Sequence, residues 1–504
     1  MTKFLLAHDL GTSGNKATLF SEDGELLASR TCSYDTNYFN GTWAEQNPND
    51  WWDAVCRSTQ ELLAEVGPVE IGAVALSGQM MGCLCVDKSG EPLRPSILYC
   101  DQRSDVEAAS ILEKVPLEEA YDIVGHRVAA VYSLEKLAWV KNNEPDIYAK
   151  TDKTLCAKDY INFKLTGRIA TDFSDASGTN AFDLNTMQWS DRMIEAAGVE
   201  RSMFPDPYES VHPLGEITSS ASEATGLPVG TPVIVGGGDG SCAGVGVGCI
   251  RPGTAYNYLG SSSWIALTTE RPIVDPAMRT MNWAHVVPGY LHPSGSVQTA
   301  GAAYAWLKSE ICRAESEEAA RTGENVYELI NQLVEASTPG AGGVVFLPYL
   351  LGERSPRWNP KARGAFVGMT LASRREDMAR AVMEGVTYNL GIIVDIFRGH
   401  VPMETMTVIG GGAKGRVWLQ MMADIYDAKI QRPNFLEEAT SMGAAVVGGV
   451  GAGVFENFDV IDRFITIEET VEPNRENQKQ YAKMKPIFDE TYHALVDVFN
   501  RMTE

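Results

Sequence analysis

The first part of the chain alternates short apolar runs with turns rich in glycine and hydroxyl side chains. Residues 4–9 (FLLAHD) form one run and end at GTSG; residues 15–20 (NKATLF) form the next, and residues 26–34 (LLASRTCSY) follow the turn SEDGE. Apolar runs of this length bounded by such turns predict strands. The chain is therefore expected to open with a three-stranded antiparallel meander.

The pattern becomes helical near residue 48. In residues 47–66 (NPNDWWDAVCRSTQELLAEV), an Asn or Asp cap precedes apolar residues spaced three to four apart, which predicts an amphipathic helix. Residues 71–79 (IGAVALSGQ) and 83–86 return to the strand pattern, with Cys83 and Cys85 on one face. This alternation of strands and helices predicts an α/β fold.

The second half of the chain repeats the same order of elements. Residues 254–269 (TAYNYLGSSSWIALTT) predict a strand, a hydroxyl-rich turn and a strand, and residues 405–426 predict a strand, a glycine turn and a helix. Two halves with this order indicate a duplication. We expect two domains, residues 1–248 and 254–504, divided at CIRPG (249–253) and enclosing a central cleft.

Composition narrows the function classes. The 504 residues exceed what one core supports, and 44% hydrophobic with 21% charged residues is typical of a folded globular protein. A net charge of −24 opposes binding to nucleic acid or anionic membranes. Nine cysteines without a CxxC pair favour buried, reduced thiols and a cytoplasmic location. We expect no export signal at the N-terminus and no membrane-spanning segment.

Asp239 is the candidate general base. It ends the run PVIVGGGD (232–239), where three glycines follow apolar residues. A hydroxyl that accepts a phosphoryl group needs a base within hydrogen-bond reach, and bare glycines would let bulky ligands approach the carboxylate. The alternative is an N-cap for a helix that begins near Ser241, and spacing alone favours that alternative.

Three further glycine turns are candidate phosphate or nucleotide sites. DLGTSG (9–14) and LGSSS (259–263) carry the backbone amides and hydroxyls of phosphate-binding turns, and Asp9 is a candidate Mg²⁺ ligand. GGGAKG (410–415) follows a strand and opens a helix, as a surface for a purine and ribose would. The alternatives are ordinary hairpin and strand-to-helix turns. Zinc-binding, EF-hand and Walker motifs are absent from the sequence.

Ten strings in the order of one family extend this interpretation. From residue 4 to about residue 455 the chain resembles the FGGY carbohydrate kinases, and within them most closely the xylulokinases. The strings are DLGTSG (9–14), WAEQNPNDWWDA (43–54), SGQMMG (77–82), RPSILYCDQRS (94–104), AKDYINFKLTG (157–167), TDFSDASGT (171–179), GGGDGSCAG (236–244), FLPYLLGERSPRWNP (346–360), EGVTYNL (384–390) and IGGGAKGRVWLQMMAD (409–424).

The resemblance implies an α/β fold of two actin-like, ribonuclease H-like domains, with a sugar in the central cleft and ATP with Mg²⁺ as cofactors. It implies that Asp239 is the catalytic base rather than only a cap, and that Asp9 is associated with Mg²⁺ and phosphate. A homodimer is compatible with it. The ATP-binding residues that it implies are Gly11, Thr12 and Ser13, then Gly260, Ser261 and Ser262, then Gly411, Gly412 and Ala413.

The sugar pocket departs from the xylulokinase pattern. We expect Gln79, Met80, Met81, Asp101 and Asp239 to bind the sugar, with Asp101 holding a hydroxyl. Met81 stands where xylulokinases have histidine, and Cys100 stands where they have asparagine, so hydrogen-bonding capacity is lost at both positions. The expected reaction is ATP-dependent phosphorylation of a small sugar. D-xylulose, another ketose, a polyol, a sugar acid and a non-sugar signal molecule stay open as acceptors. A nucleotide-gated binding protein without transfer chemistry is the alternative of another class.

Overall fold

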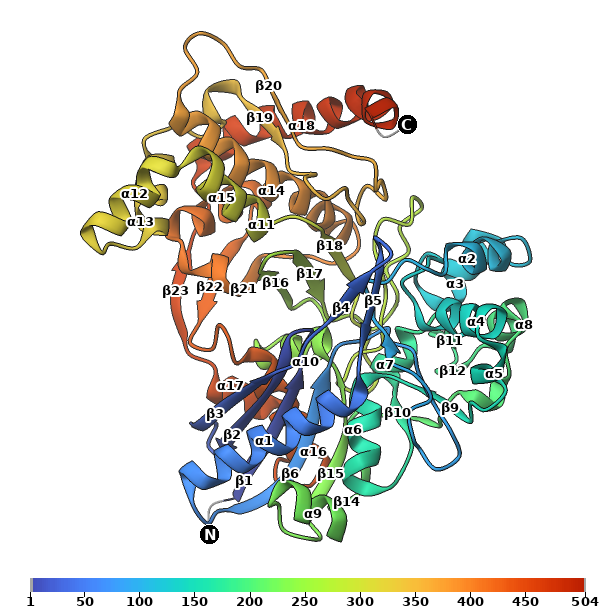
Figure 1. The fold of residues 1–504 in the computed structure, drawn as a ribbon. Helices are drawn as coiled ribbons and strands as arrows, with labels where there is room; N and C mark the ends of the chain where they lie inside the picture. The colour runs from blue at the N-terminus through green and yellow to red at the C-terminus, as the bar shows by residue number, and fades with distance from the viewer. Residues whose placement is uncertain (1–2, 503–504) are drawn as a thin grey trace.

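The computed structural model describes residues 3–502 and consists of two lobes, each built on a six-stranded sheet (Figure 1). The N-terminal sheet has the strand order β14-β15-β6-β1-β2-β3. Its strands are β1 (Lys3–Leu10), β2 (Gly14–Ser21), β3 (Leu26–Ser33), β6 (Glu70–Gly78), β14 (Pro213–Glu216) and β15 (Pro232–Gly238). Strands β1, β2 and β3 pair antiparallel, which confirms the predicted meander, while β1, β6 and β15 run parallel.

The C-terminal sheet has the order β18-β17-β16-β21-β22-β23 and the same pattern of directions. Strands β16 to β18 form an antiparallel meander, β16, β21 and β22 run parallel, and β23 is antiparallel at the edge, as β14 is in the first sheet. The predicted internal repeat is therefore confirmed at the level of topology. The strands are β16 (Ala255–Leu259), β17 (Ser263–Leu267), β18 (Ser294–Val297), β21 (Thr405–Ile409), β22 (Lys429–Pro433) and β23 (Ile467–Val471).

Helices cover both faces of the N-terminal sheet. On one face, α1 (Pro48–Val66) and α6 (Ala157–Thr166) contribute Trp51, Leu62 and Tyr160 to a core with the apolar side chains of β1 and β6. The predicted helix over residues 47–66 is confirmed, with Asn47 as its N-cap. On the other face lies α16 (Ala439–Gly451), which the chain supplies from its second half. The two halves of the sequence are thus interleaved in space.

A helical subdomain stands beside the N-terminal sheet (Figure 1, cyan and green). Its own core contains Trp139, Phe182 and Trp189. Its helices are α2 (Asp105–Leu112), α3 (Leu117–Val124), α4 (Ser133–Asn143), α5 (Pro145–Tyr148), α7 (Phe173–Ser177) and α8 (Asp191–Ala197). Its small sheets and those beside it are formed by short strands: β4 (Asn37–Phe39), β5 (Trp43–Gln46) and β8 (Ser96–Ile97); β7 (Leu84–Val86) with β9 (Lys153–Leu155); β10 (Thr171–Asp172) with β13 (Pro207–Tyr208); and β11 (Phe182–Asp183) with β12 (Gln188–Trp189).

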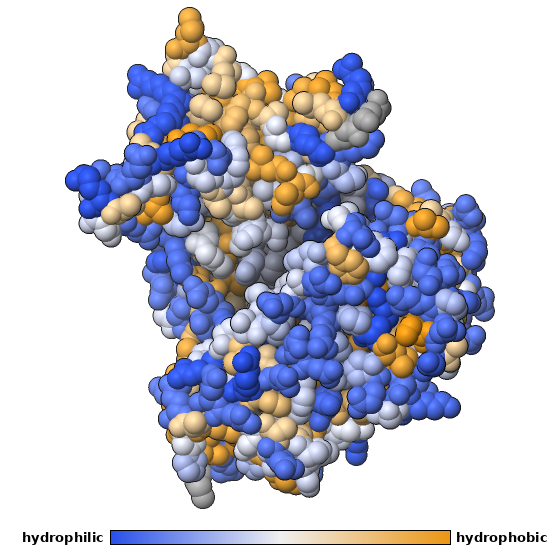
Figure 2. Space-filling model, in the orientation of Figure 1, coloured by the Kyte–Doolittle hydropathy of each residue, from blue (hydrophilic) through white to orange (hydrophobic). Residues whose placement is uncertain are grey.

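The C-terminal sheet packs against long helices that share one core with it. Trp418 and Tyr426 are fully buried in that core. The remaining elements are α9 (Ser219–Thr225), α10 (Asp239–Gly246), α11 (Gly301–Trp306), α12 (Arg313–Thr322), α13 (Val326–Glu335), α14 (Arg375–Arg398), α15 (Arg416–Tyr426), α17 (Ile461–Phe464), α18 (Arg475–Met502), β19 (Val345–Leu347) and β20 (Ala365–Val367). Figure 2 shows the surface hollowed between the two lobes.

All nine cysteines are free thiols, and seven of them are buried. Cys56 and Cys100 are partly exposed, so the expected burial of the thiols is confirmed for the other seven. Cys85 lies in β7, but Cys83 precedes that strand. Within residues 3–502, none of the helices combines the length and apolar character needed to span a bilayer.

Candidate active site

The site forms where the carboxyl ends of parallel strands meet. In the N-terminal sheet, Asp9 is in register with Ser77, and Gly238 is in register with Gly78. Strands β1, β6 and β15 therefore deliver the turn 11–13, Gln79 and Asp239 to one edge of the sheet. In the C-terminal sheet, β16 and β21 also run parallel. Their carboxyl ends deliver the second and third glycine turns to the edge that faces the cleft.

A cavity of about 570 Å³ lies between the two lobes at these edges. It brings together most of the side chains predicted from sequence. Thr12, Ser13, Gln79, Met80, Met81 and Asp239 line it from the N-terminal lobe, and Ser261 and Ser262 line it from the C-terminal lobe. Asp239 and Arg354 are the only aspartate, glutamate, lysine or arginine residues among those that line this cavity within residues 3–502.

Asp239 is the first residue of α10, and Gly238 is the N-cap of that helix. The interpretation of Asp239 as the N-cap of a helix starting near Ser241 is therefore wrong, because the helix begins two residues earlier and Gly238 has the extended backbone of a cap. The Oδ1 atom of Asp239 accepts a hydrogen bond from the Gly240 amide at 2.7 Å.

The three glycines before Asp239 make room for the protein itself. Gly236 has φ of +77°, and an added Cβ would lie 2.0 Å from the Leu76 carbonyl oxygen. A Cβ at Gly237 would lie 2.2 Å from Val286 Cγ1, and one at Gly238 would lie 2.4 Å from Met80 Sδ. The expectation that these glycines clear space for ligands is corrected: they allow close packing of β15 against β6, Val286 and Met80.

The pKa values of Asp239 and Asp9 are both raised above those of ordinary aspartates. Burial, together with the negative charge of Asp9, raises the pKa of Asp239 to about 7. Burial also raises the pKa of Asp9, although Lys16 and a hydrogen bond from Ser77 Oγ (3.2 Å) oppose the shift. Asp9 lies at the end of β1, behind the cavity lining. Two acidic groups at one sheet edge form an oxygen-rich environment that suits a divalent cation.

The first predicted phosphate turn is held from behind. The Gly11 amide donates to the Gly14 carbonyl at 3.0 Å, and the Tyr34 hydroxyl donates to the Gly11 carbonyl at 2.5 Å. The Thr12 carbonyl accepts from Gln46 Nε2 at 2.6 Å. Since the carbonyl groups of residues 11 and 12 are occupied on the side of the protein, this turn can present amides and hydroxyls to a ligand.

The second and third predicted ATP turns are neighbours. The carbonyls of Gly260 and Ser261 accept from the amides of Gly301 (2.8 Å) and Ala300 (2.9 Å). Gly411, Gly412 and Ala413 follow β21 in a 3₁₀ turn outside the cavity lining. Gly412 packs so closely on the end of β16 that an added Cβ would lie 2.3 Å from Leu259 Cδ2. Gly411 is exposed with open space above it, whereas Ala413 is fully buried.

Asp101 does not line the cavity. Its carboxylate is fully buried and accepts from the Ala44 amide (2.6 Å), the Arg103 amide (2.9 Å) and two guanidinium nitrogens of Arg103 (2.9 and 2.8 Å). Arg103 also pairs with Glu45 and stacks 4.0 Å from the ring centroid of Trp43. The expected contact with a sugar hydroxyl is therefore not what the structure shows, because these donors occupy both carboxylate oxygens.

The wall around Met81 is apolar. Met81 and Met80 pack against Val131, Tyr132, Met281 and Trp283. The backbone of Met81 has φ of +61°, and its carbonyl accepts from buried Lys136 Nζ at 2.8 Å. A left-handed backbone at a non-glycine residue is uncommon and often marks a functional site. Cys100 is half-buried, and burial raises the pKa of its thiol, which therefore stays protonated.

Several lining residues were not identified from sequence. Tyr99, Arg354 and Trp358 belong to quoted family strings without an assigned role, while His292 had no signal beyond its residue type. Arg354 Nε donates to Gln298 Oε1 at 3.1 Å. Within residues 3–502, Trp358 Nε1, His292 Nδ1 and Gln79 Oε1 are buried atoms without a hydrogen-bond partner. Such atoms need a partner, and a polar ligand would supply one.

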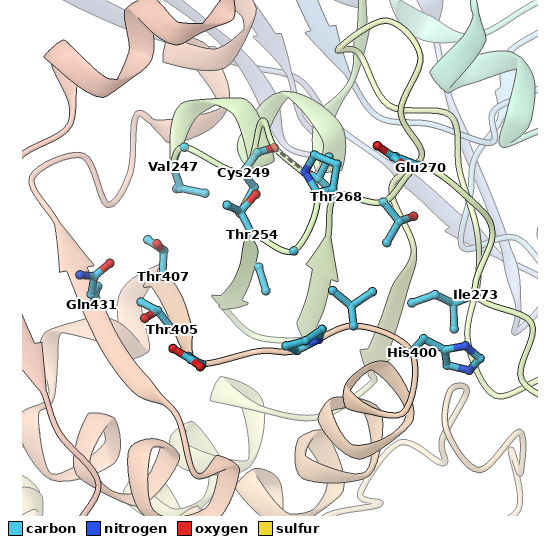
Figure 3. Close-up of a pocket in the computed structure, with 18 of the residues that line it drawn as sticks. Val247, Cys249, Thr254, Thr268, Glu270, Ile273, His400, Thr405, Thr407 and Gln431 are labelled. Carbon is cyan, nitrogen blue, oxygen red and sulfur yellow. Dashed lines mark hydrogen bonds between the residues drawn. The ribbon is translucent and has the colours of Figure 1, made fainter.

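A second cavity, of about 1120 Å³, lies at the opposite edge of the C-terminal sheet (Figure 3). It is lined by the interlobe segment 247–255, by residues that follow β17 and by residues 400–407, which lead into β21 and include its first residues. In this cavity the hydroxyls of Thr254 and Thr268 donate hydrogen bonds to the carbonyls of Arg251 and Cys249, respectively. The strands that carry the glycine turns begin at this cavity and end at the cleft, so the cleft is the candidate active site.

Comparison with known proteins agrees with this geometry. Family models of the FGGY family of carbohydrate kinases match residues 4–246 (N-terminal domain) and 255–452 (C-terminal domain). A gluconokinase of Bacillus subtilis (strain 168) is 30% identical over 516 residues, covering 100% of this chain and 98% of the relative. A xylulose kinase of Staphylococcus epidermidis is 32% identical over 498 residues, covering 97% and 96%.

Among solved structures, xylulose kinase from Rhodospirillum rubrum is 27% identical, with a TM-score of 0.90 over 99% of this chain and 100% of that chain. The similarity extends through both lobes, and the predicted two-domain α/β fold with a central cleft is confirmed. The resemblance that the ten strings carry is confirmed as well. The chain belongs to the FGGY family of carbohydrate kinases.

Proposed function

We propose that the protein transfers the terminal phosphoryl group of Mg²⁺-ATP to a hydroxyl of a small sugar or sugar acid, with Asp239 as general base. The observation that carries the proposal is the convergence of Asp239 with Thr12, Ser13, Ser261 and Ser262 around one interlobe cavity. Phosphoryl transfer mainly requires positioning and charge neutralisation, together with a group that accepts the hydroxyl proton. The side chains of this cavity can meet each requirement.

The proposed steps follow from the positions of the side chains. The Oδ1 atom of Asp239 accepts a hydrogen bond from the Gly240 amide. Oδ2 is therefore the oxygen that takes the proton of the acceptor hydroxyl. Its pKa of about 7 suits a base that works near neutral pH. The two serine- and threonine-bearing turns hold the phosphate oxygens from opposite lobes. Closure of the lobes would exclude water, which otherwise competes for the phosphoryl group.

The residues present fit ATP and Mg²⁺. The open surface above Gly411, beside the second phosphate turn, suits the adenosine, as the family resemblance implies. Asp9 would hold the cation, directly or through water, because Mg²⁺ combines one or two carboxylates with water and phosphate oxygens. The bound cation would neutralise charge on the phosphates. It would also lower the repulsion between Asp9 and Asp239.

Two acceptor classes stand out. The first is a ketopentose such as D-xylulose, which the family resemblance implies. Xylulose kinases are among the relatives. A sugar acid is the second candidate, because Arg354 is a guanidinium in the cavity lining for which no ion-pair partner is found within residues 3–502. A carboxylate is its natural partner. A gluconokinase is also among the relatives.

The deciding experiment is a coupled assay of ADP release by the purified chain. Ketopentoses, pentitols, tetritols and aldonic acids would be supplied one at a time with Mg²⁺-ATP, and the phosphorylated product would be identified by mass spectrometry. We expect acceptor-dependent ADP release with a ketopentose or an aldonate. ATP binding without ADP release for any acceptor would contradict the proposal and favour a nucleotide-gated binding protein.

A further inference from the structure

Two quoted family strings, AKDYINFKLTG (157–167) and TDFSDASGT (171–179), have no assigned role so far, although Ser174 of the second string lines the interlobe cavity beside Asp239. The structure brings them together beneath the end of β15. Lys158 is fully buried, with its Nζ 2.6 Å from Asp159 Oδ1 and 3.2 Å from both Asp172 Oδ1 and Asp175 Oδ2. Its ammonium group therefore pairs with three carboxylates of this buried cluster.

A chain of hydrogen bonds leads from this cluster to the segment that carries Asp239. Asp172 Oδ2 accepts the Ser174 hydroxyl, the Ser174 amide (2.9 Å) and the Ser210 hydroxyl (2.7 Å). Ser174 Oγ in turn accepts the Gly238 amide at 2.8 Å. The side chains that form this series of hydrogen bonds are all fully buried or nearly so.

The donor and the acceptor of each hydrogen bond in this series follow from the chemistry of the groups. An ionised carboxylate only accepts hydrogen bonds, and Asp172 forms an ion pair with Lys158 Nζ at 3.2 Å. The single proton of the Ser174 hydroxyl must therefore point at Asp172. The lone pairs of that hydroxyl are left for the amide of Gly238, the residue directly before Asp239. The Ser174 hydroxyl thus accepts the Gly238 amide, while its hydrogen bond to buried Asp172 holds it in place.

The segment before Asp239 needs such external support. Three consecutive glycines have no Cβ to restrict the backbone, so their conformation depends on outside contacts. The Gly236 amide donates to the Ser210 carbonyl at 3.0 Å, the Val235 carbonyl accepts from Asn162 Nδ2 at 2.7 Å, and Gly238 is held by Ser174. The Ser174 contact is the one next to the base.

We propose that Ser174 is a positioning residue for Asp239, held by the buried Lys158–Asp172 pair and acting through the amide of Gly238. The proposal rests on the proposed function of Asp239 as general base. Removing the hydroxyl frees the Gly238 amide and lets the first turn of α10 shift. Because misplacement by about 1 Å can reduce a rate about a hundredfold, the effect falls on kcat more than on binding.

The test compares Ser174→Ala with Ser210→Ala in the full chain. Ser210 donates to the same oxygen of Asp172, but its contact with the glycine run uses its backbone carbonyl, which the substitution keeps. We expect kcat of Ser174→Ala to fall about 10- to 100-fold with both KM values within about threefold, while Ser210→Ala stays within about threefold of the parent. Hydrogen exchange of the segment 232–240 should accelerate in Ser174→Ala alone.

Three outcomes would overturn the proposal. A rise in the acceptor KM at unchanged kcat would make Ser174 an ordinary substrate contact. Equal losses of kcat and equal exchange in both variants would reduce the network to general packing. Unchanged exchange of the segment 232–240 in Ser174→Ala would show that the hydroxyl does not hold Gly238. Failure of the proposed function is distinguishable, because the parent chain itself would then release no ADP, while the exchange comparison would still report on Gly238.

Discussion

Substitution of Asp239 by asparagine tests the central chemical claim. The amide oxygen of asparagine can accept the Gly240 amide as Oδ1 does now, so the start of α10 should keep its geometry. The variant loses only the ability to take a proton. General-base catalysis contributes about 10²- to 10⁴-fold to the rate, or about 3–5 kcal/mol, so kcat should fall by that factor. Coupled ADP release measures kcat, and fluorescence titration measures nucleotide affinity, which should change little.

The same substitution should stabilise the fold at alkaline pH. Burial and Asp9 raise the pKa of Asp239 from 3.8 to about 7, so the folded state binds the proton more tightly than the unfolded state. Ionisation of the carboxyl therefore destabilises the folded state increasingly as pH rises through this range. The destabilisation is complete above about pH 7. At 1.36 kcal/mol per unit the shift corresponds to about 4 kcal/mol, and partial exposure of the side chain lowers it to about 2–4 kcal/mol.

The thermal midpoint of Asp239→Asn should accordingly exceed that of the parent at pH 8.5, and the difference should shrink toward pH 4. Asp146→Asn, at an exposed position on α5, is the matched control and should change neither kcat nor the midpoint. Turnover of Asp239→Asn within tenfold of the parent would refute the assignment as base. An equal midpoint difference at both pH values would refute the raised pKa.

Four further predictions follow from the same contacts. In the parent chain, kcat/KM should rise with pH through about 7 as one group loses its proton, because Asp239 must be ionised to act; a flat pH–rate profile would contradict this. Arg354→Gln should raise the acceptor KM about tenfold or more and leave the KM for ATP unchanged in the ADP assay. Arg103→Met should lower the thermal midpoint, since leaving buried Asp101 unpaired costs about 3–5 kcal/mol. Asp9→Asn should increase the Mg²⁺ concentration that gives the half-maximal rate, measured by titration at fixed ATP.

Much of the fold could be predicted because strands and turns alternate clearly. The runs 4–9, 15–20 and 26–34 correspond to β1, β2 and β3 within one or two residues, and the repeat in the second half predicts the second sheet. The crossing of α16 to the N-terminal sheet could not be predicted. Apolar residues on most of the surface of a helix indicate that the helix is buried. Their periodicity does not indicate which sheet it packs against.

The site residues found from sequence are those that follow parallel strands, because strand ends are visible as a change from apolar runs to glycine turns. Arg354 and His292 come from irregular segments with no such signal. Asp101 shows the opposite error. Its residue type suited a sugar contact, but only the folded structure reveals that Arg103, two residues along the chain, takes both of its oxygens.

The glycine run before Asp239 links this proposed base to both lobes. Val286 of the C-terminal lobe packs against Gly237, and its amide donates to Ser241 Oγ at 2.9 Å. The Tyr256 hydroxyl, from β16, donates to the Gly240 carbonyl at 2.6 Å. The base is therefore attached to the two lobes at once, on the side where they touch. Closure that brings Ser261 nearer to the first phosphate turn would pivot about this contact, so phosphate would move toward a base that is already in place.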